Sequence, residues 1–183
     1  MAGRVFVVSG PSGAGKGTVV QAALAKRPDI FVSVSLTTRP ARAGEREGKD
    51  YYFVSASEFR AMASRGELLE WAEVYGDLKG TPRRPVEEAV AADRDVLLEV
   101  DIQGAQAIKR SLPEAILIFI EPPSLDDLAL RLRGRGTETT ASLSKRMRAA
   151  YEEVRRKGIF DHIVVNDDAE RAADELLRII ESQ

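Results

Sequence analysis

The chain has 183 residues, 44% of them hydrophobic and 31% charged, which is typical of a folded globular protein and excludes a disordered one. Lys and Arg number 27 against 29 Asp and Glu, so there is no net positive field to attract nucleic acid. There is no cysteine and one histidine, which excludes disulfides and cysteine- or histidine-rich metal centres, and no segment is typical of a signal peptide or membrane span. We therefore expect a cytoplasmic protein with no membrane or nucleic-acid partner and no obligate protein partner.

The first predicted elements are a strand over 4–9, a glycine-rich turn and a helix over 16–26 that ends before Pro28. The turn reads GPSGAGKGT, in which glycines let backbone N–H groups converge on an anion and Lys16 adds a positive charge. A glycine-rich turn without a ligand is the alternative. The pattern favours a phosphate-binding loop, and the residues expected to contact a nucleoside triphosphate are Gly10, Pro11, Ser12, Gly13, Ala14, Gly15, Lys16, Gly17 and Thr18.

Further elements follow in an α/β order. Up to residue 84 we expect strands at 31–36, 51–54 and 68–75 and a helix at 55–64, opened by a Ser55/Glu58 capping box. After residue 84 the pattern predicts strands at 96–100, 115–120 and 162–165. It also predicts helices at 85–92, 124–132 and 140–157, the last of which ends at Gly158. A final helix extends to Ile180 and is capped by Asp167 or Asp168. His162 lies within a strand pattern, which favours a structural role.

These elements predict an α/β fold: a three-layer core around a parallel sheet, with insertions near 35–84 and 125–158. Glu99 and Asp101 lie at the carboxyl end of one strand, where open α/β sheets bind ligands. Both insertions carry arginine-rich clusters, which are solvated surface in most proteins. Beside a phosphate-binding loop, they provide the positive charge that phosphoryl transfer requires.

Several longer motifs carry a family resemblance. In addition to the loop, they are SVSLTTRPARAGEREGKDYYFV at 33–54, ELLEWAEVYG at 67–76, DIQGAQ at 101–106, EPPS at 121–124, GRGTET at 134–139 and VNDD at 165–168. In this order and spacing the chain resembles guanylate kinases over nearly its full length. The resemblance implies a P-loop nucleoside monophosphate kinase that converts GMP to GDP with ATP and Mg²⁺. It also implies a core at 1–34, 85–124 and 159–183, a GMP-binding region at 35–84 and a lid at 125–158.

The resemblance also assigns residues by position. It implies that the GMP phosphate is held by Ser35, Arg39, Arg42 and Tyr51, a role that suits guanidinium and hydroxyl donors. Arg135 and Arg146 resemble lid arginines that reach the transferred phosphoryl group, with Arg131 a weaker candidate. Asn166 resembles a residue on the adenine side of the ATP site. The catalytic set is therefore Lys16, Arg39, Arg135 and Arg146.

Guanine recognition calls for a carboxylate, because guanine presents two adjacent donors, N1–H and N2–H₂, that one carboxylate accepts in parallel. Strand periodicity leaves Glu70 and Glu73 as alternatives, since they lie on opposite faces. The resemblance favours Glu70. It adds Thr81 as a donor to the base and Asp101 as a second candidate acceptor.

Two positions depart from the family pattern. Gly17 replaces the usual Ser or Thr, so no protein ligand for Mg²⁺ is assigned and the role of Thr18 stays open. Lys79 replaces a tyrosine, and we expect it to contact the GMP phosphate as a flexible point charge. Two other functions are alternatives: a guanylate-kinase-like phosphopeptide-binding module, and an adenylate-kinase-like enzyme, which conflicts with the 33–54 segment.

Overall fold

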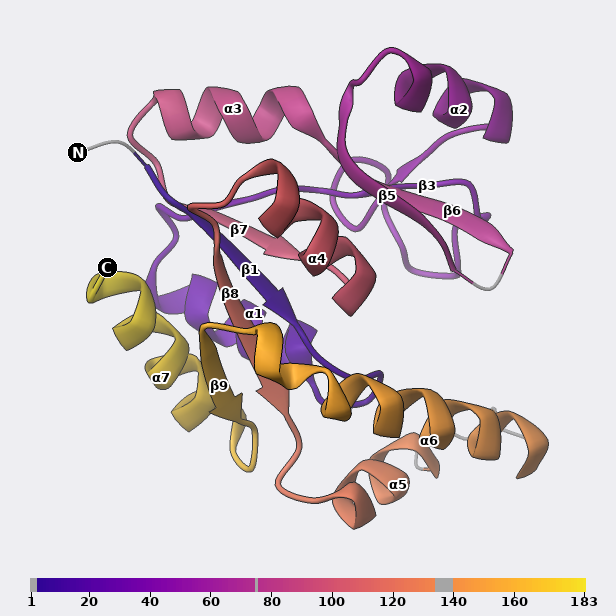
Figure 1. Ribbon diagram of the computed structural model, residues 1–183, viewed down its shortest axis with the longest axis vertical. Helices are drawn as coiled ribbons and strands as arrows, with labels where there is room; N and C mark the ends of the chain where they lie inside the picture. The colour runs from indigo at the N-terminus through magenta and orange to yellow at the C-terminus, as the bar shows by residue number, and fades with distance from the viewer. Residues whose placement is uncertain (1–2, 75, 134–139) are drawn as a thin grey trace. The chain divides into compact units, whose positions relative to one another are not determined.

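The computed structural model describes residues 3–74, 76–133 and 140–183 (Figure 1). The described residues form two compact units. The first unit comprises residues up to 5, 30–98 and 103–115, and the second comprises residues 6–29, 99–102 and 116–183. Each unit is described by itself below.

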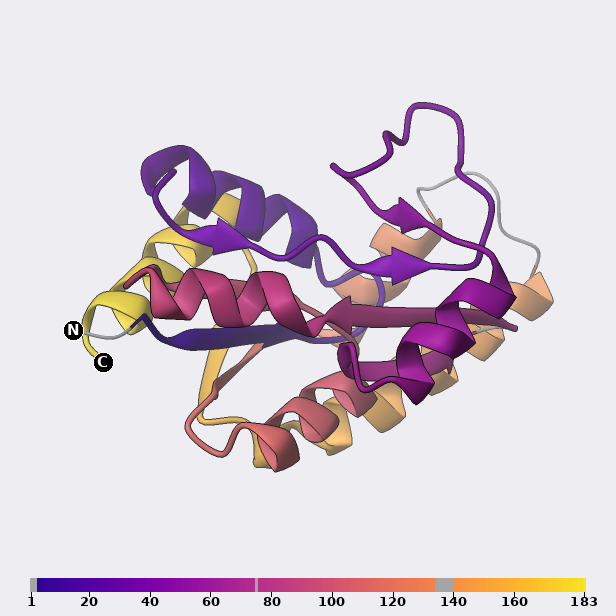
Figure 2. The same ribbon diagram turned by 90° about the horizontal axis from the view of Figure 1, so that it is seen from above.

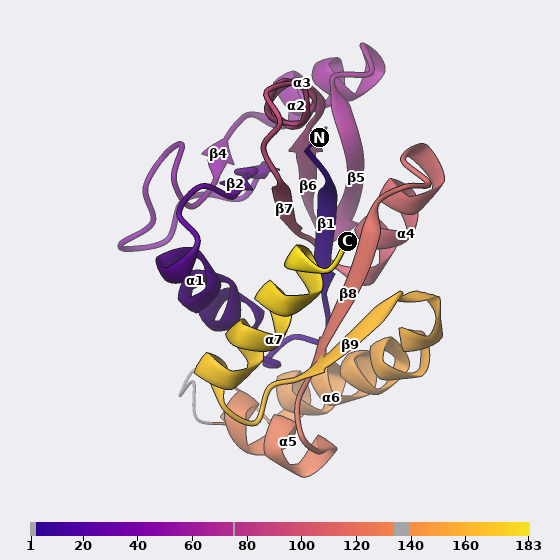
Figure 3. The same cartoon turned by 90° about the vertical axis from the view of Figure 1, so that its left-hand side faces the viewer.

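The second unit is built on parallel strands. Strands β1 (Val5–Ser9) and β9 (His162–Val165) flank β8 (Ile116–Glu121), with Phe6 paired to Ile116 and Ile118 paired to His162. β1 and most of β8 are buried and apolar, as expected for parallel strands covered on both faces. Helices α1 (Lys16–Lys26) and α7 (Ala169–Glu181) lie side by side and in contact (Figure 3).

Two more helices of this unit pack on each other. α5 (Leu125–Arg133) and α6 (Thr140–Arg155) share a small core of Leu128, Leu132, Ala150 and Met147. A single 3₁₀ turn over Lys157–Ile159 then leads towards β9. α6 thus ends at Arg155, earlier than predicted, and Gly158 lies inside the 3₁₀ turn instead of ending the helix.

The first unit contains a four-stranded sheet in the order β4-β3-β6-β5. Its strands are β3 (Leu36–Thr37), β4 (Tyr52–Phe53), β5 (Leu68–Val74) and β6 (Asp77–Pro82). Helix α2 (Ala56–Ser64) lies on this sheet, where Phe59 packs with Leu36, Leu68 and Leu78 (Figure 1). The segment between β3 and β4 projects from the sheet as a long loop (Figure 2).

The other elements of this unit are two strands and two helices. β2 (Phe31–Val32) pairs in parallel with β7 (Val96–Glu99), and the helices are α3 (Arg83–Ala91) and α4 (Ile102–Ser111). β7 and α4 cross the boundary between the two units, since residues 99–102 belong to the second. No helix within the described ranges is long and apolar enough to cross a membrane.

The predicted α/β fold with a parallel sheet is confirmed, with corrections to individual elements. The single strand expected at 31–36 is two short strands, β2 and β3, which belong to different sheets. β6 and α4 were not predicted, because β6 contains Asp, Gly and Pro, residues depleted from strands, and α4 carries Gly104. The sequence left Asp167 and Asp168 as alternative caps of the last helix. In the structure Asp168 is the N-cap, and its side chain accepts a hydrogen bond from the Arg171 N–H at 2.9 Å.

Candidate functional site

The glycine-rich turn follows the buried strand β1 and closely approaches β8. A Cβ on Gly10 would lie 2.1 Å from the Ile120 carbonyl oxygen, and the φ of Gly10 is +145°. Both facts require glycine at this position. The turn therefore lies tightly against the sheet at the carboxyl end of its strands, where α/β proteins bind ligands.

The turn leads into the N-terminus of α1, which has no side-chain cap. Gly15 is the N-cap residue, in a left-handed conformation at φ +84°, and the first turn of α1 has no acidic residue. The first N–H groups of α1 are thus arranged to receive an anion, with the positive end of the helix dipole behind them. Lys16 adds a full charge beside them, and its Nζ donates to the carbonyl oxygens of Gly10 at 2.6 Å and Pro11 at 3.3 Å.

The middle of the loop is clamped by two distant side chains. The Ala14 carbonyl oxygen accepts from Asn166 Nδ2 at 2.6 Å and from Arg131 Nη1 at 3.3 Å, while Arg131 Nη2 donates to the Asn166 carbonyl at 2.8 Å. Arg131 and Asn166 border an open pocket of about 320 Å³, which is also lined by Gly13, Gly15, Thr18, Asp167 and Ala169. The pocket therefore adjoins the loop and the first turn of α1.

Two carboxylates lie at the carboxyl end of β7, in the second unit. A Cβ on Gly17 would lie 3.8 Å from Glu99 Oε2 and 4.0 Å from Oε1, so the Glu99 carboxylate reaches the position where a residue-17 hydroxyl would stand. Asp101 follows two residues later. Among the residues that the structure describes, no cluster of three or more His, Asp and Glu could ligate a metal ion. Carboxylates near a glycine-rich loop still suit a hydrated Mg²⁺, since they accept hydrogen bonds from its water ligands.

Of the two predicted lid arginines, only one can be located. Arg146 lies half-buried on α6, whereas Arg135 lies outside the described residues. Arg131, the weaker candidate, is on α5 and donates to the backbone carbonyl oxygens of Ala14, in the loop, and of Asn166, after β9. We call the loop, Lys16, Glu99, Asp101, Arg131, Arg146 and Asn166 the loop half-site.

The first unit carries a second cluster, around Arg39. Both oxygens of Glu45 accept from its guanidinium, with Nη1–Oε2 and Nη2–Oε1 distances of 2.7 Å, and the guanidinium carbon lies 5.1 Å from the Tyr51 ring centre. Glu45 Oε2 also accepts the Arg42 N–H at 2.8 Å. Since Arg39 has five N–H donors, Glu45 orients the guanidinium and leaves further donors for another anion. Glu45 was not among the site residues predicted from the sequence.

These contacts lower the pKa of Glu45 to about 2, chiefly through the Arg39 hydrogen bonds and then the Arg42 N–H. The contribution of the pair to stability is therefore fully present above pH 4.5 and is lost only as the pH falls through about 2. We expect the Glu45 carboxyl ¹³C shift in an NMR titration to stay constant between pH 7 and pH 4. A midpoint near 4.5, that of an unpaired carboxyl, would contradict the pairing.

Lys79 and Tyr51 lie together in the same unit. Lys79 Nζ is 3.4 Å from the Tyr51 hydroxyl and 5.1 Å from the ring centre, so the ammonium lies over the aromatic face. Arg39 lies against the same ring. Ser35, half-buried, precedes β3. Arg39 and Lys79 therefore both lie against the ring of Tyr51, so three of the residues predicted to hold the GMP phosphate are in contact.

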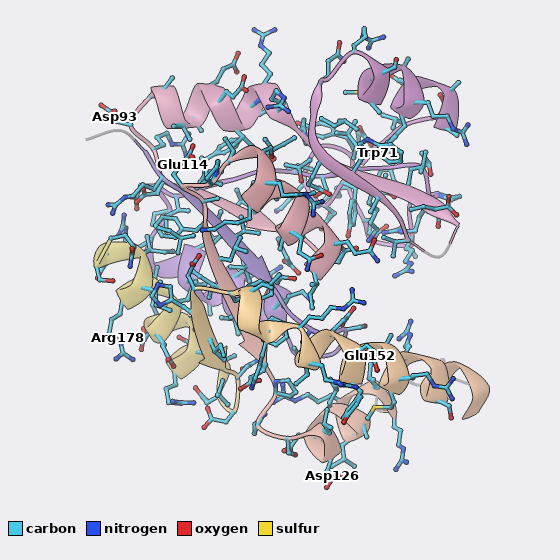
Figure 4. All side chains as sticks on the ribbon, in the orientation of Figure 1. Trp71, Asp93, Glu114, Asp126, Glu152 and Arg178 are labelled. Atoms are coloured by element: carbon cyan, nitrogen blue, oxygen red, sulfur yellow. The ribbon has the colours of Figure 1, made fainter. Side chains whose placement is uncertain are left out.

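The two alternative carboxylates of β5 differ sharply in environment. Glu70 is 9% exposed and its Oε1 accepts from the hydroxyl of Thr81, 1% exposed, at 2.7 Å. Glu73 is exposed, and so is Trp71 at 52% (Figure 4). A buried carboxylate held by a hydroxyl is suited to accept further donors from a ligand. We call Ser35, Arg39, Arg42, Glu45, Tyr51, Glu70, Lys79 and Thr81 the arginine half-site. Asp101, also predicted here, is in the other unit.

The family model of guanylate kinase matches residues 2–183. The chain belongs to the guanylate kinase family. It is 50% identical over 170 residues to a guanylate kinase of Parasynechococcus marenigrum, with 93% of each chain covered, and 45% identical over 181 residues to one of Carboxydothermus hydrogenoformans, covering 99% of this chain and 89% of that one. The crystal structure of guanylate kinase from Anaplasma phagocytophilum superposes with a TM-score of 0.82 at 37% identity, covering 99% of this chain and 86% of that one.

The predicted site residues of this guanylate kinase are divided between the two units. The loop half-site contains the residues expected to bind ATP, and the arginine half-site contains those expected to bind GMP, apart from Asp101. Sequence reasoning missed Glu45 and the P-loop contacts of Arg131. Glu45 had one usable signal, because it is the only acidic residue among the basic and turn-forming positions 39–46.

Proposed function

We propose that the two half-sites carry out the guanylate kinase reaction, the ATP-dependent phosphorylation of GMP to GDP. The chain is an enzyme of this family, and one observation supports the proposal most strongly. One chain contains both parts of the site that the reaction needs. The loop with Lys16, at the uncapped N-terminus of α1, is suited to a triphosphate, and the buried Glu70–Thr81 pair is suited to a guanine. Nothing in the fold or the relatives favours the phosphopeptide-binding alternative.

In this proposal the loop half-site binds ATP. The N–H groups of the loop and of the first turn of α1 hold the phosphates, and Lys16 exchanges its carbonyl partners for phosphate oxygens. The pocket beside Asn166 and Arg131 receives the adenosine part. Arg146 and Arg135 stabilise the negative charge of the transferred group as it moves.

Mg²⁺ is proposed as the metal of the reaction. Bound to the ATP phosphates, it neutralises charge on the triphosphate. Because Gly17 has no hydroxyl, the protein's part is indirect: Glu99 accepts hydrogen bonds from the water shell, close to the position of the missing side chain.

The arginine half-site binds GMP. Arg39 and Arg42, oriented by Glu45, hold the GMP phosphate with Ser35 and Tyr51, and Glu70 accepts the guanine N1–H and N2–H₂. Thr81 fixes Glu70 by donating its single hydroxyl proton to Oε1, so the predicted donation from Thr81 to the base would require it to release Glu70. A GMP phosphate oxygen attacks the γ-phosphorus, the bond to the β–γ bridging oxygen breaks, and ADP leaves with the bond electrons. Positions 35–84 are the proposed GMP-binding region and 125–158 the lid; the cytoplasmic location stays a prediction.

Lys79 is expected to contribute to GMP binding. Replacing it by alanine should raise the KM for GMP roughly 10- to 100-fold, since a hydrogen bond to a charged group is worth about 1.5–3 kcal/mol. The KM for ATP should stay within twofold. Steady-state kinetics with each substrate varied in turn measures both, and an unchanged KM for GMP would contradict the role of Lys79.

The test of the function is a panel of nucleoside monophosphates. Purified protein with Mg²⁺ and ATP is offered GMP, dGMP, AMP, CMP and UMP in turn, and ADP formation is followed by a coupled assay. We expect turnover with GMP far above that with AMP. Equal or better turnover of AMP, or no diphosphate product from any acceptor, would overturn the proposed function.

A further inference from the structure

Arg171, in the first turn of α7, contacts the turn between β9 and α7 at several points. Its Nε donates to Asp167 Oδ1 at 2.8 Å, and its Nη2 donates to the same oxygen and, at 3.1 Å, to the Val165 carbonyl oxygen. Its backbone N–H donates to Asp168 Oδ1 at 2.9 Å. The side chain and the backbone of one residue therefore hold three residues of the turn.

The same turn is one wall of the pocket beside the phosphate-binding loop. Asn166 and Asp167 both line this pocket of about 320 Å³. Asn166 is 5% exposed and its Nδ2 donates to the Ala14 carbonyl oxygen at 2.6 Å. A Cβ on Gly15 would lie 2.4 Å from this Nδ2, so the amide is packed directly against the loop. A displacement of the turn would therefore change both the pocket wall and the contact with the loop.

The contact between Arg171 and Asp167 fixes a direction more than it stabilises the fold. The two side chains are 50% and 51% exposed, and an isolated ion pair at such a position contributes little to stability. Asp167 Oδ1 also accepts the Asp168 N–H at 2.6 Å, so three donors meet at this one oxygen, and Oδ2 accepts none of these bonds. The pKa of Asp167 is lowered, chiefly by its hydrogen bonds to Arg171. The planar guanidinium thus holds the carboxylate in one orientation.

We propose that Arg171 is a positioning residue of the ATP site, which holds the turn over 165–168 so that Asn166 and Asp167 form the wall of the pocket for the adenosine part. The inference rests on the proposed function, because it assigns this pocket to ATP. Arg171 does not touch the nucleotide in this scheme. It acts through Asp167 and the Val165 carbonyl, as outer-shell groups act through the residues that they orient. Because the loop holds the phosphates, loss of Arg171 should weaken binding of the nucleoside part and not of a bare triphosphate.

The test is a calorimetric titration with two probes: the β,γ-imido analogue of ATP, which is not turned over, and inorganic tripolyphosphate, which lacks the nucleoside. Arg171→Ala should weaken binding of the analogue roughly 3- to 10-fold, the loss that corresponds to about one net hydrogen bond, and leave binding of tripolyphosphate within twofold. Arg171→Lys should also bind the analogue more weakly than the parent protein, because an ammonium does not reproduce the planar fork. The matched control is Arg178→Ala, which removes an exposed arginine of the same helix and should match the parent protein with both probes (Figure 4).

Equal binding of the analogue to the parent protein and to either Arg171 variant would overturn the proposal. So would an equal loss for both probes, which would indicate a general loosening of the loop. A double-mutant cycle with Asp167→Ala tests the route: Arg171→Ala should cost less in that background, since two of its side-chain bonds go to that carboxylate, and fully additive losses would contradict it. If the parent protein binds the analogue but turns over no GMP, the proposed function fails, and the titrations still decide the role of Arg171.

Discussion

Replacement of Lys16 by methionine is expected to lower kcat roughly 10²- to 10³-fold, with a much smaller change in the KM for GMP. Removal of one preorganised donor aimed at developing charge costs about this much in other enzymes. Lys16 is the first residue of α1 and lies at the uncapped helix N-terminus, so its charge adds to the N–H groups that face the same anion. Methionine keeps the length of the side chain and removes the charge.

The matched control is Lys26→Met, at the other end of the same helix. Lys26 is exposed and pairs with Asp174 at 2.6 Å and Glu170 at 2.9 Å, contacts that contribute little at a surface. Its kcat should stay within twofold of the parent protein. Coupled kinetics measures both variants, and thermal unfolding checks that they are folded. A Lys16→Met enzyme that keeps a tenth or more of its kcat would show that this lysine does not serve phosphoryl transfer.

The parts of the site that the sequence predicted best are contiguous. The strand, loop and helix at 5–26 are adjacent in the chain, so the position of each residue follows from local geometry, and α1 begins and ends at the predicted residues. Ser55 likewise caps α2 as expected, accepting the Glu58 N–H at 3.1 Å. Local patterns suffice here because the partners are only a few residues apart.

The clamps on the loop could not be predicted in this way. Arg131 and Asn166 reach the Ala14 carbonyl oxygen across 117 and 152 residues of chain. In the sequence, Arg131 is one of several arginines of an amphipathic helix and was a candidate only for the lid, so nothing indicated a contact with the loop backbone. The contact depends on how α5 packs within the second unit, which no local sequence period encodes.

Strand periodicity could not distinguish Glu70 from Glu73, and the reason is different. Strand pairing changes register between Leu68 and Glu70, so Leu68, Leu69 and Glu70 are all buried, and strict alternation begins only after them. Such an irregularity redirects side chains, as bulges near functional sites commonly do. The family resemblance pointed to Glu70, and the structure shows why the two positions differ: only Glu70 is buried and hydrogen-bonded to a threonine.

The second large effect is expected at this residue. Glu70→Gln should lower kcat/KM for GMP roughly 100-fold or more, because a hydrogen bond to a charged group is worth about 1.5–3 kcal/mol and the carboxylate is proposed to accept two from guanine. Glutamine offers one acceptor, and its amide N–H₂ faces a guanine donor. The side chain keeps its size and its contact with Thr81, so a folding defect is not expected.

Base selectivity separates loss of recognition from a general loss of activity. Adenine presents one donor and one acceptor on the equivalent edge, which the amide of glutamine matches and the carboxylate of Glu70 does not. The ratio of kcat/KM for GMP to that for AMP should therefore fall by more than kcat/KM for GMP alone. Glu73→Gln, an identical exchange at an exposed position of the same strand, should leave the ratio unchanged. If the ratio survives in Glu70→Gln, the selectivity of the enzyme for guanine must come from another residue, and Asp101 becomes the first to test.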